Sequence, residues 1–95
     1  MANNKLPGAY ARMAAQYPEL AQVVEALGST TKELGPLDEK TAQLIQLAAA
    51  ASIRSEGAVH SHTRRALEAG ATAAEIHHSL LLLVSTIGFP LPWRR

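Results

Sequence analysis

The sequence predicts an all-α protein, a single-domain bundle of about five helices. Nowhere does it show the alternation of apolar and polar residues that is typical of a half-buried strand. Ala, Leu, Glu and Gln, all good helix formers, dominate its longer segments. Proline, glycine and capping residues divide these segments into short helices. A chain of 95 residues has the size of one domain, which we expect to span residues 1–95.

The first third of the chain should form two helices. We expect the first from Gly8 to Gln16, because Pro18 suits the first turn of the next helix, where its missing N–H costs nothing. The second helix has apolar residues at the i, i+3, i+4, i+7 spacing of an amphipathic helix. These residues are Leu20, Val23, Val24 and Leu27. Gly35-Pro36 then breaks the chain.

A third helix should start after Asp38, an N-cap residue, and run to about Arg54. Glu39 in its first turn complements the positive end of the helix. Its centre, residues 44–51, carries small side chains on several faces, and these let neighbouring backbones approach closely. We therefore expect it to be the central helix of the bundle.

Two further helices complete the bundle. The fourth should end at Gly70, a typical glycine stop. Thr72 and Glu75 form a capping box at the start of the fifth. From Leu80 the fifth helix is apolar nearly all round, which suits burial between subunits, and Gly88-Phe89-Pro90 ends it.

The composition indicates an oligomer. Hydrophobic residues make up 47% of the chain and charged residues only 18%, against a usual charged share of ~25%. A small chain cannot cover that much apolar surface alone, so we expect a homo-oligomer. A net charge of +1, with no stretch that interleaves basic and aromatic residues, argues against nucleic-acid binding.

The sequence also predicts a cytoplasmic protein without membrane contact. Its longest strongly apolar run, residues 80–84, is far below the ~20 residues that cross a bilayer. The first residues lack the apolar core of a signal peptide. With no cysteine, neither a disulfide nor thiolate chemistry is expected.

Histidine titrates near neutrality, and the chain has two pairs, His60/His62 and His77/His78. Residues two apart on a helix lie ~200° apart, so His60 and His62 should point in opposite directions. The spacing therefore gives no support for a metal site within one subunit. A site assembled across subunits remains an alternative.

The expected fourth helix has two faces of different character. Glu56 and His60 lie four apart, with Arg64 continuing the stripe. We favour an exposed polar ladder, worth ~0.2–0.5 kcal/mol per pair, over a carboxylate–imidazole pair at the rim of a pocket. His62 faces the other way, on an apolar stripe that includes Ala58 and must meet the core or a subunit partner.

Residues 54–70 resemble the signature helix of the carboxymuconolactone decarboxylase and alkylhydroperoxidase D-like family. Redox members of that family carry Cys-x-x-Cys-x-x-x-His in this helix. With His62 as anchor, the cysteine positions fall on Ser55 and Ala58, and the proton-relay Glu of the preceding helix falls on Gln43. Both thiols and the carboxylate are therefore replaced together.

The resemblance covers about residues 37–90. Leu37-Asp38-Glu39-Lys40-Thr41 resembles the start of the family's central helix, and residues 62–76 resemble its His-x-x-x-Ala-x-x-x-Gly-Ala-Thr-x-x-Glu-Ile pattern. Gly88-Phe89-Pro90 resembles its Gly-Phe/Val-Pro ending. The resemblance implies an all-α subunit in a closed oligomer, commonly a trimer or hexamer, with pockets at subunit interfaces.

The family contains thiol-dependent peroxidase-like proteins and cofactor-free decarboxylases that act on a carboxylated muconolactone. The chain stands nearer the second branch, which implies a reaction without a cofactor on a small organic acid or lactone. One alternative is a redox protein of alkylhydroperoxidase type, against which the missing cysteines argue. The other is a non-catalytic oligomeric binding or structural protein, which the sequence does not separate from the decarboxylase.

The resemblance and the helix faces together give a set of candidate site residues. His62 would donate or accept the proton, and His60 or Arg64 of a neighbouring subunit would hold a carboxylate. Gln43 can form hydrogen bonds but cannot relay a proton as Glu does. The candidate catalytic residues are His62, His60, Gln43 and Ser55, and the candidate substrate contacts are Arg64, Glu56 and Ala58.

Overall fold

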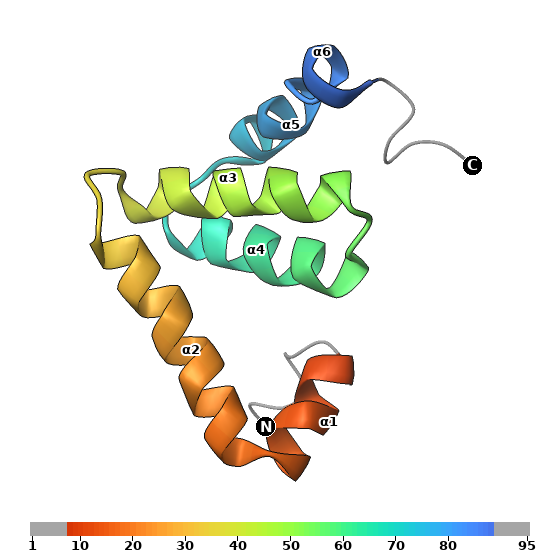
Figure 1. Cartoon of the computed structure of the whole chain (residues 1–95). Coiled ribbons are helices and arrows are strands. Elements are labelled where there is room, and N and C mark those ends of the chain that lie inside the picture. Colours follow the sequence, from red (N-terminus) through yellow and green to blue (C-terminus); the bar gives the residue numbers. More distant parts are fainter. Residues whose placement is uncertain (1–7, 89–95) are drawn as a thin grey trace. The chain divides into compact units, whose positions relative to one another are not determined.

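A computed structural model describes residues 8–88, and this part of the chain consists of helices joined by short connections. The helices are α1 (Gly8–Gln16), α2 (Pro18–Glu33), α3 (Glu39–Ser52), α4 (Glu56–Glu68), α5 (Ala73–Leu81) and α6 (Val84–Ile87) (Figure 1). No strand occurs between residues 8 and 88, so the prediction of an all-α fold is confirmed. The chain forms two compact units, Met1–Leu37 and Asp38–Arg95.

The first unit contains α1 and α2. Pro18 begins α2 as expected, and the Tyr10 hydroxyl of α1 donates a hydrogen bond to Glu25 Oε2 of α2 at 3.3 Å. Ala21 is the buried residue of α2. The apolar stripe of α2, by contrast, has side chains that are 41–63% exposed: Leu20, Val23, Val24 and Leu27. Within its own unit, α2 therefore leaves an apolar face uncovered.

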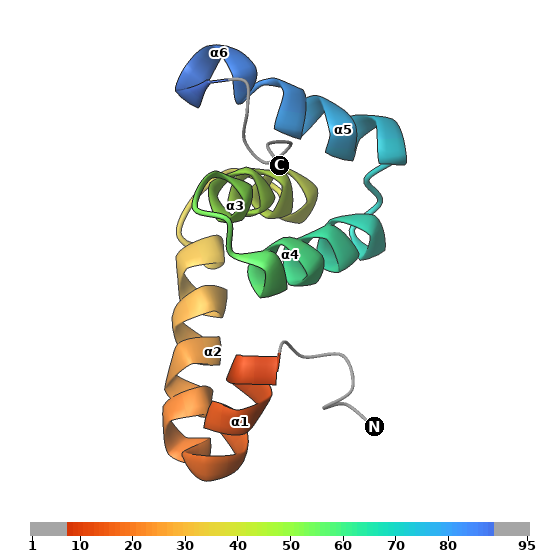
Figure 2. The same ribbon diagram turned by 90° about the vertical axis from the view of Figure 1, so that its right-hand side faces the viewer.

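In the second unit, α3 lies between α4 and α5, as Figure 2 shows in its view along α3. The N-cap is Asp38, whose carboxylate accepts a hydrogen bond from the Thr41 backbone N–H at 2.9 Å. A cluster of buried apolar residues joins the three helices and contains Leu47, Ala66, Ala71 and Ile76. The prediction that the third helix is central is therefore confirmed for this unit.

Helix α4 ends as its glycine predicts. Gly70 has a φ of 99°, a backbone conformation that residues with a Cβ rarely adopt. The Gly70 N–H donates to the Leu67 carbonyl at 3.0 Å, and the Ala71 N–H donates to the Ala66 carbonyl at 2.9 Å. This is the Schellman pattern of helix termination, and it directs the chain back towards α5.

The same pattern ends α3, but an arginine takes the place of the glycine. Arg54 has a φ of 59°. Its N–H donates to the Ala51 carbonyl at 3.1 Å, and the Ser55 N–H donates to the Ala50 carbonyl at 2.9 Å. The helix thus stops at Ser52, two residues before the expected limit.

The capping box of α5 is present. The Thr72 N–H donates to Glu75 Oε1 at 2.9 Å, and the Glu75 N–H donates to Thr72 Oγ1 at 3.0 Å. The helix nevertheless does not continue unbroken to Gly88: it ends at Leu81, and the four-residue α6 follows. The expectation of one continuous helix was wrong here. Phe89 and Pro90 of the expected terminus lie outside the described residues.

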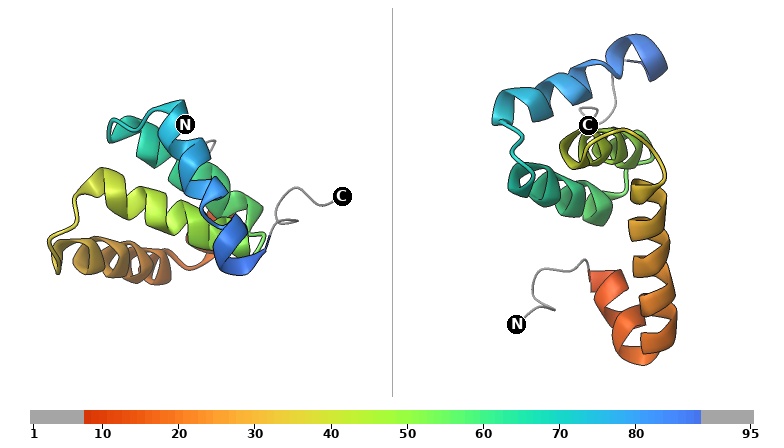
Figure 3. Two further views of the ribbon diagram at one scale, coloured as in Figure 1. Left: turned by 90° about the horizontal axis from the view of Figure 1, so that it is seen from above. Right: turned by 90° about the vertical axis from the view of Figure 1, so that its left-hand side faces the viewer.

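The interruption between α5 and α6 has a local cause. The Leu83 N–H donates to the Leu80 carbonyl at 3.1 Å, a tighter i→i−3 bond than the α-helical one. Thr86 Oγ1 donates to the Leu82 carbonyl at 3.1 Å, which competes with the backbone pattern. Three of the four α6 residues are β-branched, which also disfavours helix. As Figure 3 shows, α5 and α6 still follow one another along the same side of α3.

None of the helices described is both long and apolar enough to span a membrane.

Candidate functional site

The site predicted from the signature helix centres on a hydrogen bond between α4 and α3. Nδ1 of His62 lies 2.7 Å from Oε1 of Gln43. Gln43 is fully buried and His62 is half-buried. The residue that aligns with the family's proton-relay position is thus in direct contact with the histidine.

The orientation of the Gln43 amide determines which of the two partners donates. An amide oxygen can only accept a hydrogen bond, so the proton in this bond belongs to His62 Nδ1. In the neutral imidazole, the second nitrogen, Nε2, then carries the lone pair. Nε2 is therefore the atom of His62 that can accept a proton from another molecule, or return one to it.

A third residue extends the hydrogen-bonded chain. Gln43 Nε2 donates to Glu39 Oε2 at 2.7 Å, one turn earlier on α3. Glu39 is exposed and stands in the first turn of that helix. Sequence reasoning assigned Glu39 only to the helix end and missed its contact with Gln43. The available signal was the i, i+4 spacing of the two residues, which places them side by side on a helix.

Sequence reasoning also missed Gln46. Its Oε1 is buried and has no hydrogen-bond partner within the described part of the chain. Gln46 follows Gln43 by three residues on α3, so the two side chains are neighbours on the helix surface. A buried acceptor left unsatisfied costs about 1–3 kcal/mol, and a donor group on a bound molecule would remove that cost.

Ser55 and Ala58 occupy the positions of the family's two cysteines. Ser55 is the N-cap of α4, and its side chain makes no capping hydrogen bond. Both residues are half-buried. Helical periodicity places them on the same face of α4 as His62, seven and four residues before it. Ser55 and His62 are about 10 Å apart along the helix axis, which does not support a Ser–His dyad.

The remaining candidates lie away from this face. His60 and Arg64 each stand two residues from His62, about 200° around the helix. His60 and Glu56 are exposed, Arg64 is half-buried, and no ion pair joins Glu56 to His60. The structure of one chain therefore does not bring His60, Glu56 or Arg64 to His62. Their predicted roles in substrate binding require a neighbouring subunit.

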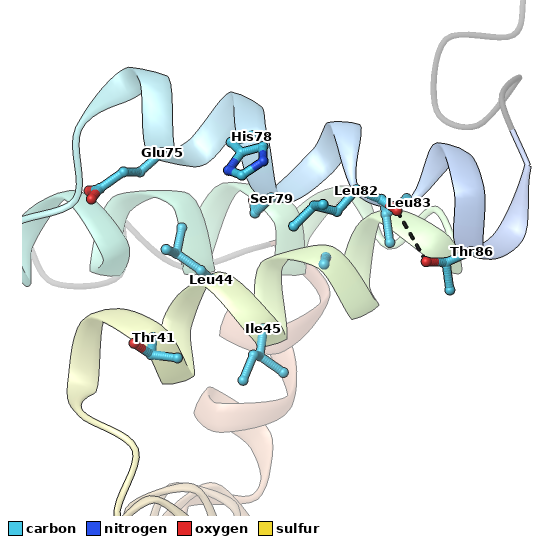
Figure 4. Close-up of a pocket in the computed structure, with 10 residues that line it drawn as sticks. Thr41, Leu44, Ile45, Glu75, His78, Ser79, Leu82, Leu83 and Thr86 are labelled. Carbon is cyan, nitrogen blue, oxygen red and sulfur yellow. Dashed lines mark hydrogen bonds between the residues drawn. The ribbon is translucent and has the colours of Figure 1, made fainter.

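A groove of about 320 Å³ lies between α3 and the α5–α6 segment. Leu82 and Leu83 line one side of it, and Leu44 and Ile45 of α3 line the other (Figure 4). Its lining is mostly apolar and includes neither His62 nor Gln43. The apolar segment that the sequence assigned to a subunit interface thus borders an open groove.

The acidic side chain at this groove is held in its charged form. The Thr72 backbone N–H and, second, the Lys40 ammonium lower the pKa of Glu75 from its ordinary value of 4.5. Outside the groove, hydrogen bonds from Thr41 lower the pKa of Asp38 in the same way. Neither carboxyl group is therefore suited to donate a proton near neutral pH, in contrast to a histidine.

Within residues 8–88, no group of three or more His, Cys, Asp or Glu side chains is arranged to hold a metal ion.

Comparison with known proteins agrees with the resemblance in the motifs. Residues 18–93 match the model of the carboxymuconolactone decarboxylase family. The match starts at Pro18, well before the Leu37 at which the motif resemblance begins. The chain is also 37% identical over 57 residues to an uncharacterized protein of Haemophilus influenzae, a range that covers 60% of this chain and 50% of that protein. The chain thus matches only about half the length of that relative.

Proposed function

The chain belongs to the carboxymuconolactone decarboxylase family, and on that premise we propose that it is a cofactor-free acid–base enzyme. Its substrate would be a small carboxylated lactone. The observation that carries this proposal is the 2.7 Å hydrogen bond between His62 and Gln43. This bond holds an imidazole on a packed helix face and assigns its lone pair to Nε2, as a general acid–base group requires.

The proposed reaction is decarboxylation with protonation at carbon. The bond between the ring carbon and the carboxylate breaks, CO₂ leaves, and the electron pair passes into the conjugated lactone carbonyl. His62, protonated at Nε2 from solvent, then delivers that proton to carbon and becomes neutral. Gln43 holds the ring in place throughout, because its carbonyl accepts the Nδ1 hydrogen bond in both charge states.

Gln46 provides a second point of support for a bound polar molecule. Its buried Oε1 lacks a partner within the described residues, and a hydroxyl or protonated carboxyl group of a substrate would supply one. The carboxylate that leaves also needs a cation or a hydrogen-bond donor beside it. Within one chain, His60 and Arg64 face away from His62, so we assign this role to a neighbouring subunit.

The proposal therefore includes a homo-oligomer, with a trimer or hexamer implied by the family resemblance. The exposed apolar surface supports it. Leu81 and Leu82 are each 56% exposed, and Ile87 is 44% exposed. Association of subunits would bury this surface and bring polar residues of one chain to the site of another.

A non-catalytic oligomeric binding protein is the second candidate, and one observation favours it. The groove of about 320 Å³ lies between α3 and α5–α6 rather than at His62. A protein that had kept the fold while losing its chemistry would have the same arrangement. A thiol peroxidase is not proposed, because the chain has no cysteine.

Incubation of the purified protein with a carboxylated muconolactone would test the proposal, with CO₂ release and loss of the lactone as readouts. We expect turnover by the natural sequence and a loss of about 10²- to 10⁴-fold in kcat for His62→Gln. The substituted glutamine would still offer a side-chain amide to Gln43, so the helix packing should survive. In D₂O, the product should carry one deuterium, bound to a ring carbon over which the released electron pair is delocalised.

His77→Gln is the matched control. His77 is exposed on α5, outside the two helices that carry the proposed site, so this variant should retain full turnover. If the natural protein forms oligomers and binds the lactone without releasing CO₂, the non-catalytic function replaces the enzymatic one. An equal loss of turnover in His62→Gln and His77→Gln would show that His62 has no specific role in the reaction.

A further inference from the structure

The orientation of the Gln43 amide depends on a residue outside the predicted site. Gln43 Nε2 lies 2.7 Å from Glu39 Oε2, and Gln43 Oε1 lies 2.7 Å from His62 Nδ1. An amide group presents a donor on one side and an acceptor on the other, and a rotation of 180° exchanges them. Nothing in the contact between Gln43 and His62 alone selects one of these two orientations.

Glu39 removes this ambiguity. A carboxylate accepts hydrogen bonds and does not donate them, so it requires the NH₂ side of the Gln43 amide. The carbonyl side must then face His62. With the opposite orientation, Gln43 would donate to Nδ1, the ring would carry its proton on Nε2, and Glu39 would face a second acceptor.

We infer that Glu39 is a positioning residue, which acts through Gln43 to hold His62 in the Nδ1–H tautomer and so makes Nε2 the basic nitrogen. The selection of the tautomer follows from the hydrogen bonds that join Glu39, Gln43 and His62. Its importance for turnover rests on the proposed function. Because the bond to Glu39 is charge-assisted and both bonds are partly buried, the preference should persist in the folded protein.

The tautomer can be read directly from the ¹⁵N signals of the histidine rings. A protonated ring nitrogen and one with a lone pair differ strongly in ¹⁵N chemical shift, and long-range ¹H–¹⁵N spectra assign the two signals to Nδ1 and Nε2. In the full-length protein, at a pH where His62 is neutral, we expect the protonated signal at Nδ1. In Glu39→Ala, the Nε2–H form of His62 should appear and become substantially populated.

Two further variants separate positioning from a general loss of structure. Glu39→Asp retains a carboxylate, which can only accept from the Gln43 amide, and should keep more of the Nδ1–H form than Glu39→Ala. Glu19→Ala removes an acidic residue from the first turn of α2 and should leave the His62 signals unchanged. Circular dichroism of all three variants would show that the helices remain.

Activity provides an independent readout. If the protein decarboxylates the lactone, Glu39→Ala should lower kcat by up to about 10²-fold with little change in KM, and Glu39→Asp, which keeps the carboxylate, should lose less. A tautomer that shifts in Glu39→Ala without any turnover in the natural protein would support the inference and overturn the proposed function. His62 signals that are the same in Glu39→Ala and the natural protein would overturn the inference, whatever the activity.

Discussion

Lys40 Nζ lies 3.1 Å from Glu75 Oε2, and this ion pair joins the first turn of α3 to the capping box of α5. The same carboxylate also accepts the Thr72 N–H through Oε1. The Glu75 side chain thus caps the start of α5 and connects it to α3 through Lys40, 35 residues earlier in the chain. The ion pair requires Glu75 to be charged, and only the charged carboxylate offers both oxygens as acceptors.

This arrangement predicts a loss of stability in acid. The Thr72 N–H and Lys40 lower the pKa of Glu75 below 4.5, and Thr41 lowers the pKa of Asp38 below 3.8. A carboxyl group whose folded pKa is depressed stabilises the fold above its unfolded pKa and loses that effect as the pH falls through the folded value. The free energy of unfolding should therefore fall as the pH drops below about 4.5.

Urea denaturation between pH 7 and pH 2.5 would measure this loss. Glu75→Gln keeps an acceptor for the Thr72 N–H and loses the ion pair, so its stability should depend less on pH in this range. Glu75→Ala loses both interactions and should be the less stable variant at neutral pH. An acid transition with the same slope in Glu75→Gln and the natural protein would show that Glu75 does not contribute to it.

Replacement of Arg54 by glycine should stabilise the protein. Arg54 adopts a φ of 59° at the end of α3, where helices usually place glycine. A left-handed conformation costs a residue with a Cβ roughly 1–2 kcal/mol, and the greater freedom of glycine in the unfolded chain offsets about half of that gain. Arg54→Gly should raise the free energy of unfolding by about 0.5–1 kcal/mol.

Arg54→Ala is the matched comparison, since it removes the charged side chain and keeps the Cβ. Thermal or urea denaturation should show little stabilisation in this variant. A gain as large as that of Arg54→Gly would point to the arginine charge, not to the backbone conformation.

The exposed apolar segment predicts an oligomer. Light scattering at micromolar concentration should show at least a trimer. Leu82 is 56% exposed in the single chain, so Leu82→Asp should dissociate the oligomer and leave the helices intact. A charge buried without a partner at an interface costs several kcal/mol, which weakens association by more than about 10²-fold.

Ala74→Asp provides the control for that experiment. Ala74 is exposed in the first turn of α5, where an acidic residue is favourable, and it does not line the groove. This variant should remain oligomeric. If the natural sequence is a stable monomer, a neighbouring subunit cannot supply the carboxylate-binding residues of the proposed site.

The natural chain should have no dithiol-dependent peroxidase activity. The thiolate is the group that attacks a peroxide, and Ser55 and Ala58 cannot supply one. Peroxide consumption coupled to a thiol reductant should equal the protein-free background. Turnover that persists after removal of trace metals would contradict this expectation.

The converse experiment tests how the motif aligns with the family. A Ser55→Cys, Ala58→Cys, Gln43→Glu variant places two thiols at the start of α4, where the helix end favours the thiolate. This variant should form a reversible disulfide and consume peroxide above background. Its failure to form the disulfide would show that the two positions do not correspond to the family's cysteines.

Local signals predicted the helix boundaries well, and the tertiary contacts less completely. Asp38, Thr72 and Gly70 act on their own helix ends, so their effects can be read from neighbouring residues. The turn at Leu82 depends on the hydrogen bond from the Thr86 side chain to the Leu82 carbonyl, which a pattern of apolar and polar residues does not reveal.

The candidate site was predicted in part: its central pair of residues was expected, and its further contacts were not. The resemblance aligned His62 and Gln43 with two site positions of the family, and the structure shows the two residues in contact. Glu39 was missed because an exposed acid in a first helical turn has a sufficient local explanation. The groove beside Leu82 was missed because its two walls come from segments that are distant in sequence.

The amide of Gln43 lies between two groups that can change charge and cannot itself do so near neutral pH. A proton therefore cannot travel from Glu39 to the ring of His62, and every proton that the ring exchanges must pass through Nε2. A planar intermediate held beside that nitrogen would receive its proton on one face only. If the chain is the proposed decarboxylase, its product should form as a single stereoisomer wherever the protonated carbon is stereogenic, or becomes stereogenic through deuterium in D₂O.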